Sequence, residues 1–310
     1  MILFTSLKPL HRAENIKAVF DAYDGDKEFF QVTPGKYNPI FEDQRFAVRV
    51  TDELIGASPG KAVMIGHGFA GGKTYGLDQP HPYHRRENAQ LLTYVVTTSP
   101  HMVGLVANQC GVPEDRVLPL GMPRSDAFFR TKKGDGGTVM AKKRGYLYAP
   151  TFRNRAEPPA FELNWHWIDN LLTDDEIMVV KPHMMVQHIL DRNRFKHIVE
   201  ASHMEPSTPY VIDCDVLITD YSSILSDAHV AGKPVVLFAK NDKYLSTRGM
   251  YLPYPDGYAS RFATNEEKLV KLCREANAPQ EADIKCRELT AGACDGHSSE
   301  RVAKLIREMI

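Results

Sequence analysis

The sequence lacks any apolar run near the roughly 20 residues that a membrane-spanning helix needs. It lacks an excess of charge: the formal net charge is -1, whereas nucleic-acid-binding proteins more often carry a strong basic excess. Its five cysteines are odd in number and scattered, with neither the density of a disulfide framework nor the spacing of a zinc site. These absences predict a cytoplasmic protein that binds no nucleic acid. Peripheral contact with the inner face of the cell membrane is left open.

Motifs for metal chemistry and for a serine nucleophile are also missing. The 12 histidines never adopt the i, i+4 pairing with a glutamate that zinc hydrolases use. No serine lies in a nucleophile-elbow pentapeptide, and the glycines from Gly71 to Gly76 lack the spacing of a nucleotide P-loop. We therefore expect no metal and no other cofactor.

Strand-like runs alternate with helical patterns along the whole chain, which predicts an α/β fold with parallel sheets. The predicted strands are Met1–Leu7, Lys61–Ile65, Tyr94–Thr98, Arg116–Leu120, Tyr146–Ala149, Ile177–Val180, Asp215–Thr219 and Pro234–Ala239. Residues His101–Gln109 are predicted to form a helix, and Ser298–Ile310 an amphipathic helix.

The segment Thr131–Thr138 is rich in glycine and lysine, so we predict a flexible, solvated linker there. The linker divides the chain into an N-terminal acceptor-side domain, residues 1–132, and a C-terminal nucleotide-donor-binding domain, residues 133–310. The last helix is left free to pack back on the first domain. Two doubly wound, Rossmann-like domains would face a central cleft, the default ligand site of such folds.

The stretch Asp215–Phe238 reads as strand, tight turn, helix and strand, with small hydroxyls and an acid crowded into Thr219–Ser223. Ser222 or Ser223 can cap the following helix. A helix N-terminus also offers N–H groups and partial positive charge, which favour a phosphate. From the residues alone, capping and phosphate binding are equally good readings.

A second stretch is Gly66-His67-Gly68, directly after the strand Lys61–Ile65. A histidine between two glycines is closely approachable by a substrate and titrates near neutrality, as a general base must. The alternative is a glycine-rich turn in which His67 has no role.

A third stretch is Lys181-Pro182-His183, again at a strand end. Lysine and histidine there would neutralise a phosphate leaving group, or they are solvated charges of a surface turn. Two further polar strand ends, Pro123–Asp126 and Ala149–Arg153, are either part of the site or ordinary turns.

The order of these motifs resembles one family, the CDP-glycerol glycerophosphotransferases, which include teichoic-acid and capsule polymerases and primases. The resemblance runs from about Lys61 to the C-terminus. It is carried by Gly66-His67-Gly68, Gly121–Asp126, Tyr148–Arg153, Lys181–His183, Asp215–Ser223, Gly232–Pro234 and Asp295-Gly296. The family implies a GT-B architecture, with the nucleotide held by the C-terminal domain and no metal.

The resemblance also implies roles. His67 would deprotonate the acceptor hydroxyl, and His183 would lie beside the donor diphosphate as the second catalytic residue. The donor's phosphates and nucleotide would be bound by Thr219, Asp220, Ser222, Ser223, Lys181, Arg153, Ser298 and Ser299. Gly66, Gly68, Arg124 and Asp126 would belong to the acceptor side or the cleft. For Ser298 and Ser299, capping of the last helix is the alternative.

The family usually has a tryptophan before the His67 position and a threonine-proline after its glycine, where this chain has Gly66 and Phe69-Ala70. Proline normally follows the His183 position, where this chain has Met184. These departures affect the acceptor and the transferred group more than the fold.

The expected function is transfer of a polyol phosphate, with glycerol phosphate as first choice, from a CDP-linked donor to a hydroxyl of a polymer, glycan or lipid-linked acceptor. CMP would be released. The alternative within the same fold is a glycosyltransferase of capsule synthesis that uses CMP-sialate, CMP-Kdo or a UDP-sugar. A binding module without catalysis is the third possibility.

Overall fold

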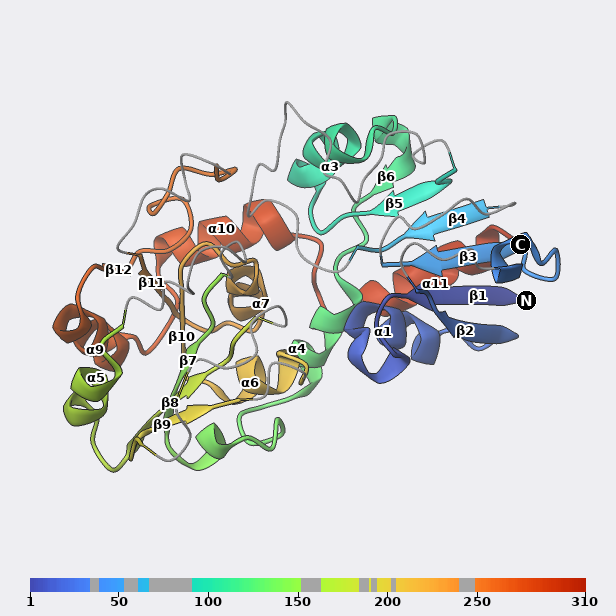
Figure 1. Ribbon diagram of the computed structural model, residues 1–310. Helices are drawn as coiled ribbons and strands as arrows, with labels where there is room; N and C mark the ends of the chain where they lie inside the picture. The colour runs from blue at the N-terminus through green and yellow to red at the C-terminus, as the bar shows by residue number, and fades with distance from the viewer. Residues whose placement is uncertain are drawn as a thin grey trace. The chain divides into compact units, whose positions relative to one another are not determined.

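The structure, a computed structural model, describes residues 1–33, 39–52, 61–66, 91–151, 163–183, 190, 194–201, 205–239 and 249–310. The chain forms two compact units (Figure 1). The first comprises Met1–Phe129 together with Glu288–Ile310, and the second comprises Arg130–Arg287. The last helix thus belongs to the first unit, whose leading segment ends three residues before the predicted boundary at 132.

The first unit contains a six-stranded sheet in the order β2-β1-β3-β4-β5-β6, and every pairing is parallel. Its strands are β1 (Ile2–Ser6), β2 (Lys27–Gln31), β3 (Val48–Thr51), β4 (Lys61–Met64), β5 (Tyr94–Val96) and β6 (Val117–Leu118). The four strands predicted in this region are confirmed, whereas β2 and β3 were not predicted.

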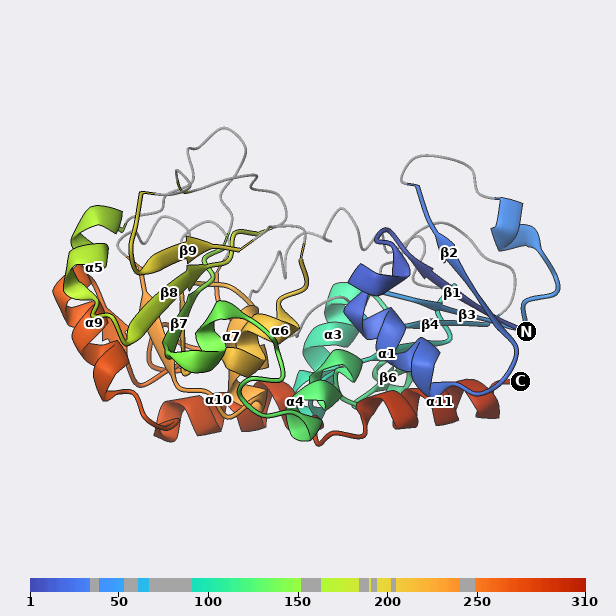
Figure 2. The same cartoon turned by 90° about the horizontal axis from the view of Figure 1, so that it is seen from below.

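Helices cover both faces of this sheet. On one face, α1 (Glu14–Ala22) and α11 (Ser298–Glu308) lie side by side (Figures 1 and 2). The apolar stripe of α11, including Val302 and Ile306, packs with β1, β3 and β4 side chains, so the predicted amphipathic helix is confirmed. The other face packs against α3 (Val103–Cys110). The short helices of this unit are η1 (Leu10–Arg12), η2 (Pro39–Glu42), η3 (Pro100–Met102), η4 (Glu114–Arg116) and η5 (Pro123–Asp126).

Strand β3 shows why its sequence is hard to recognise. Arg49 interrupts the apolar pattern, yet it is only 2% exposed and its guanidinium lies 5.0 Å from the centre of the Phe41 ring. Burial lowers the pKa of Arg49 to about 10. Arg49 is therefore accommodated in a buried strand by its contact with the Phe41 ring, which only the tertiary structure creates.

The second unit repeats the design, with a parallel six-stranded sheet in the order β12-β11-β10-β7-β8-β9. The strands are β7 (Arg144–Tyr148), β8 (Glu176–Val180), β9 (Ile198–Glu200), β10 (Val216–Thr219), β11 (Val235–Phe238) and β12 (Phe262–Ala263). Of these, β9 and β12 were not predicted.

One face of this sheet packs against α5 (Trp165–Leu171) and α9 (Glu266–Glu275) (Figure 1). Two further helices, α6 (Thr208–Asp213) and α7 (Ile224–Val230), contact the sheet outside this cluster of side chains. The remaining short elements are η6 (Val139–Lys142) and α4 (Ala127–Arg130). The two boundaries between the units fall within α4 and within α10 (Glu281–Ala291).

The segment Thr131–Thr138, which was predicted to be a flexible, solvated linker, is bound by a buried aspartate. The Asp213 carboxylate, which is 0% exposed, accepts hydrogen bonds from the backbone N–H groups of Gly134, Gly136 and Thr138 at 2.8, 3.0 and 2.7 Å. Burial raises the pKa of Asp213, but these hydrogen bonds outweigh it and leave the pKa below its usual value. Lys132, Gly134, Asp135 and Gly137 are exposed, as a solvated segment requires, but three backbone N–H groups of the segment are bound by a buried acceptor about 75 residues further along the chain.

We expect Asp213→Asn to lower the free energy of unfolding by about 2–3 kcal/mol, since three backbone N–H groups lose a charged acceptor that is itself buried. Because the folded-state pKa is depressed, the contribution is present above the unfolded value of about 3.9 and is lost as pH falls through the folded pKa. Denaturant unfolding at several pH values would show the difference from wild type shrinking in acid. Asp135→Ala serves as the control. It removes a carboxylate of the same segment that accepts the Lys132 N–H. An unchanged difference at every pH would contradict this role.

Candidate functional site

The predicted donor motifs of the second unit meet at one edge of its sheet. Strands β8, β7 and β10 are neighbours, and their carboxyl ends lead into Lys181, Ala149 and Asp220. The Lys181 N–H donates to the Tyr148 carbonyl at 2.8 Å, and the Ala149 N–H to that of Ile218 at 2.9 Å. The structure therefore brings together three segments that are separated by about 30 to 70 residues in the sequence, as parallel strand ends must.

Asp220 and Thr219 hold these segments in place. The Asp220 carboxylate accepts from the backbone N–H groups of Thr151 and Tyr221 at 2.7 and 2.6 Å. The Thr219 hydroxyl donates to the Ala149 carbonyl at 2.7 Å. Both residues are buried, at 4% and 0% exposure. Their side chains join the ends of β7 and β10, and direct contact with a donor stays a prediction.

Ser222 and Ser223 are placed differently, in partly exposed positions at the start of α7. Ser223 has helical backbone angles, φ -65° and ψ -11°, and its side chain makes no capping hydrogen bond. Instead, the carbonyls of Ser222 and Ser223 accept the N–H groups of Leu225 and Ser226 at 3.2 and 3.1 Å. Side-chain capping by Ser223, one of the two readings of this turn, is thus not what the structure has.

The other predicted residues of this edge are only partly described. Lys181 is buried at 7% exposure and His183 is half-buried, both directly after β8. His67, Gly68 and Arg153 lie outside the described residues, so their predicted roles are not tested.

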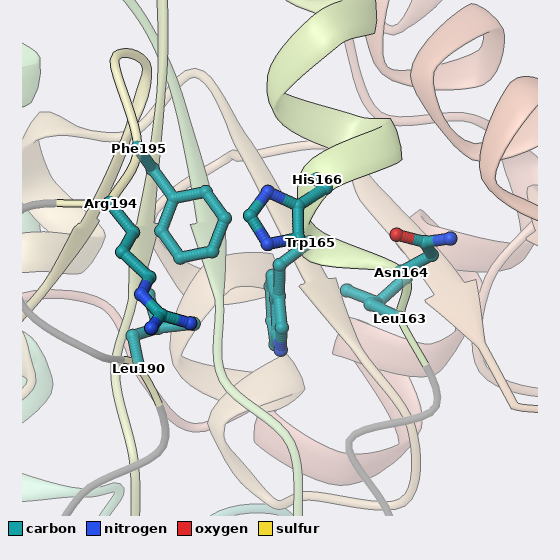
Figure 3. Close-up of a pocket in the computed structure, with 7 residues that line it drawn as sticks. All are labelled: Leu163, Asn164, Trp165, His166, Leu190, Arg194 and Phe195. Carbon is teal, nitrogen blue, oxygen red and sulfur yellow. The ribbon is translucent and has the colours of Figure 1, made fainter.

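A pocket of about 360 Å³ lies in the same unit, between the start of α5 and the residues around Phe195 (Figure 3). The His166 and Phe195 rings are tilted by 49° to each other with their centroids 5.0 Å apart. The Trp165 ring packs edge-on against that of Tyr148, the last residue of β7, with 5.6 Å between centroids. Its lining is Leu163, Asn164, Trp165, His166, Leu190, Arg194 and Phe195. Aromatic rings with a nearby guanidinium suit a flat, polar-edged ligand.

Sequence reasoning missed this pocket. Both tryptophans of the chain lie in Asn164-Trp165-His166-Trp167, a signal that could have drawn attention to it. The half contributed by Leu190, Arg194 and Phe195 has no such signal, because only the fold brings it to α5.

In the first unit, the predicted residues Gly66 and Arg124 are linked by a residue that the sequence did not single out. Asn15 of α1 donates from Nδ2 to the Gly66 carbonyl at 3.1 Å and accepts at Oδ1 from the Arg124 N–H at 3.0 Å. Gly66 has φ +66°, a conformation that favours glycine, in agreement with the tight turn predicted there.

Asp126 and the last helix form a second arrangement in that unit. The Asp126 carboxylate accepts from the N–H groups of Ser298 and Ser299 at 2.9 and 2.8 Å, at the start of α11. Gly121 (φ +88°) packs so closely that a Cβ there would lie 2.3 Å from the Ser298 hydroxyl. Asp126 therefore caps the start of α11, whereas Ser298 and Ser299 are its first two residues and the Ser299 hydroxyl donates to the Pro123 carbonyl at 3.2 Å. Capping by these two serines, the alternative reading, is thus not what the structure has, and phosphate binding by them stays a prediction.

Metal-binding clusters and membrane-spanning helices are both absent from the described ranges. No group of three or more histidine, cysteine, aspartate or glutamate side chains there could hold a metal ion. No helix within these ranges has the length and apolar character to span a membrane.

The family model described as CDP-Glycerol:Poly(glycerophosphate) glycerophosphotransferase matches residues 41–308. The chain belongs to this family. The resemblance inferred from the order of the motifs is thereby confirmed.

Curated relatives of the family are distant. The chain is 24% identical over 265 residues to the teichoic acid ribitol-phosphate polymerase TarL of Staphylococcus aureus (strain NCTC 8325 / PS 47), covering 79% of this chain and 47% of TarL. It is 24% identical over 223 residues to the teichoic acid glycerol-phosphate primase of Bacillus subtilis (strain 168), covering 70% of this chain and 58% of the primase. The chain thus spans about half the length of the curated relatives it matches.

Solved structures share the fold. The wall teichoic acid polymerase TagF superposes with a TM-score of 0.78 at 17% identity, covering 99% of this chain and 88% of that one. MnaA of S. aureus, solved with UDP, gives 0.60 at 14% identity, with coverage of 100% and 97%. With the two parallel sheets, the TagF likeness confirms the predicted α/β fold of the GT-B type. The central cleft stays a prediction.

We expect Asp126→Ala to lower the free energy of unfolding by about 2–3 kcal/mol, because the buried N–H groups of Ser298 and Ser299 lose their acceptor. Asp126→Asn, which keeps one acceptor oxygen, should lose less. Denaturant unfolding measures both, with Asp43→Ala, at a partly exposed turn that bonds Arg45, as the control. Equal stability of wild type and Asp126→Ala would contradict the capping role.

Proposed function

We propose that this chain transfers glycerol phosphate from CDP-glycerol to a hydroxyl group of a polymer, glycan or lipid-linked acceptor and releases CMP. The observation that carries the proposal is that Lys181 and His183 follow β8 while Ser222 and Ser223 follow β10, at the carboxyl ends of strands in one parallel sheet, in a chain that belongs to the glycerophosphotransferase family. Relatives named for glycerol phosphate and for ribitol phosphate both support a CDP-linked polyol as donor. A TagF variant was solved with CDPG, which supports the same donor class.

The proposed reaction is an in-line displacement at the donor's β-phosphorus. The acceptor oxygen forms a new bond to phosphorus, the bond from phosphorus to the CMP oxygen breaks, and His67 takes the acceptor's proton. Lys181 and His183 neutralise charge on the leaving CMP, while Ser222 and Ser223 bind phosphate oxygens. Catalysis then comes mainly from positioning and electrostatic stabilisation, as in other phosphoryl transfers.

The pocket at α5 extends the proposal to the nucleoside. Trp165, His166 and Phe195 offer aromatic surfaces, and Arg194 offers hydrogen-bond donors beside them. Such a lining suits a nucleobase, and the contact between Trp165 and Tyr148 keeps it near the end of β7. We propose that the cytosine of the donor binds there.

For location we propose the cytoplasm, with contact at the inner face of the membrane where a lipid-linked acceptor would be reached. The five cysteines are all buried and none forms a disulfide, which supports a reducing compartment. Burial raises the pKa of Cys110 and of Cys214 to about 12, so these thiols stay protonated near neutral pH.

His67→Ala should lower kcat by at least about 100-fold, because the general base is lost, while the affinity for CDP-glycerol stays close to that of the wild type. CMP release and calorimetric donor binding measure the two effects. His101→Ala, at an exposed histidine outside the motifs, is the matched control. Weakened donor binding with normal turnover would show that His67 is not the base.

Ser222→Ala and Ser223→Ala should each weaken donor binding by roughly 10-fold, because a hydroxyl that bonds a charged phosphate oxygen is lost. The same calorimetric titration tests this, with Ser260→Ala as the control; Ser260 accepts the Ala282 N–H.

A panel of CDP-glycerol, CDP-ribitol, CMP-sialate, CMP-Kdo and UDP-sugars identifies the donor. Release of nucleotide only from a sugar donor would overturn the glycerol phosphate proposal, and no release from any donor would indicate a binding module.

A further inference from the structure

Asn15 is a buried polar residue in the first turn of α1, with 3% of its surface exposed. Its amide nitrogen donates to the Gly66 carbonyl at 3.1 Å, and its amide oxygen accepts from the Arg124 N–H at 3.0 Å. The two partners fix the orientation of the amide, since a carbonyl requires the nitrogen and an N–H requires the oxygen. Both ends of the side chain are therefore committed to backbone groups.

The two backbone groups belong to segments that the proposed function needs. The Gly66 carbonyl is part of the peptide group that joins Gly66 to His67, and Gly66 itself is left-handed, with φ +66°. Strand β4 is held up to this point, because the Ile65 N–H donates to the Thr51 carbonyl at 2.8 Å. Beyond Ile65, the Asn15 contact holds the Gly66 carbonyl, the last backbone acceptor of the described segment.

The second segment, η5, is itself anchored to the last helix of the unit. Arg124 lies in η5, two residues before Asp126, whose carboxylate binds the start of α11. Through Arg124, Asn15 ties the Gly66 peptide to the packing of α1 and α11 on the sheet. A single amide thus connects the end of β4 to the face of the sheet that α1 and α11 cover.

We propose that Asn15 is a positioning residue of the reaction: it fixes the peptide that precedes His67 and so sets the position of the base. This inference rests on the proposed function. Asn15 does not contact the substrate; its loss leaves the base attached to a glycine turn with one fewer constraint. Misplacement of a reacting group by about 1 Å can cost around 100-fold in rate.

The first test is Asn15→Ala, assayed with CDP-glycerol and an acceptor by CMP release. We expect kcat to fall by about 10- to 100-fold, with calorimetric affinity for CDP-glycerol unchanged, because the donor residues lie on the other unit. Asn265→Ala removes an asparagine that caps α9, where its Oδ1 accepts the Lys268 N–H at 2.9 Å. This control should lose stability of the same order and keep its kcat.

The second test, Asn15→Asp, separates positioning from folding. A protonated carboxyl at this site can donate to the Gly66 carbonyl and accept from the Arg124 N–H, as the amide does. The carboxylate cannot donate. The ratio of its kcat to that of the wild type should therefore rise as pH is lowered, whereas the ratio for Asn15→Ala stays low at every pH. Groups present in both proteins, such as Glu14 and Asp126, cancel in the ratio.

The outcomes distinguish this inference from the function beneath it. Absence of CMP release by the wild type with every donor overturns the proposed function, and the inference falls with it. CMP release by the wild type together with an unchanged kcat for Asn15→Ala overturns the inference alone. If Asn15→Ala does not fold, the ratio for Asn15→Asp decides, measured where circular dichroism shows the variant folded. A flat ratio overturns the inference.

Discussion

Parallel strand pairing is the constraint on which the rest of the structure depends. Each described strand of both sheets runs in the same direction as its neighbours, so every connection must cross a face and return to the same edge. Helices therefore cover both faces, strands such as β1 and β8 are buried throughout, and all carboxyl ends collect on one side of each sheet. The polar turns after β7, β8 and β10 lie together for this reason alone.

Buried aspartates hold the segments that leave these strands. Asp126 binds two backbone N–H groups of α11, Asp213 binds three of the glycine-rich segment, and Asp220 joins the ends of β7 and β10. A carboxylate can accept several hydrogen bonds at once, and charge makes each one stronger. The molecule thus uses one chemical device for three tasks: starting a helix, fixing a connection and shaping the edge where the donor is proposed to bind.

The strands that were predicted are those whose apolar residues form an unbroken run, such as β8 and β10. Edge strand β2 has only half-buried and exposed residues in no regular alternation, and β12 has two residues only, so neither carries a strong local pattern. The glycine-rich segment Thr131–Thr138 is a different case, because its local composition gives no sign of its long-range contact. Its composition is that of a linker, and nothing nearby in the sequence indicates that Asp213, some 75 residues on, receives its N–H groups.

The sequence by itself determined the parallel α/β class, the family and the motifs at the strand ends, because apolar runs, turn residues and motif order are local properties of the chain. Only the tertiary structure decided which strands are neighbours, that Asp126 caps the start of α11, and that Asn15 joins Gly66 to Arg124. These contacts connect residues about 50 to 170 positions apart. Hydrogen bonds of such range leave no periodic trace, because their partners are chosen by packing and not by spacing.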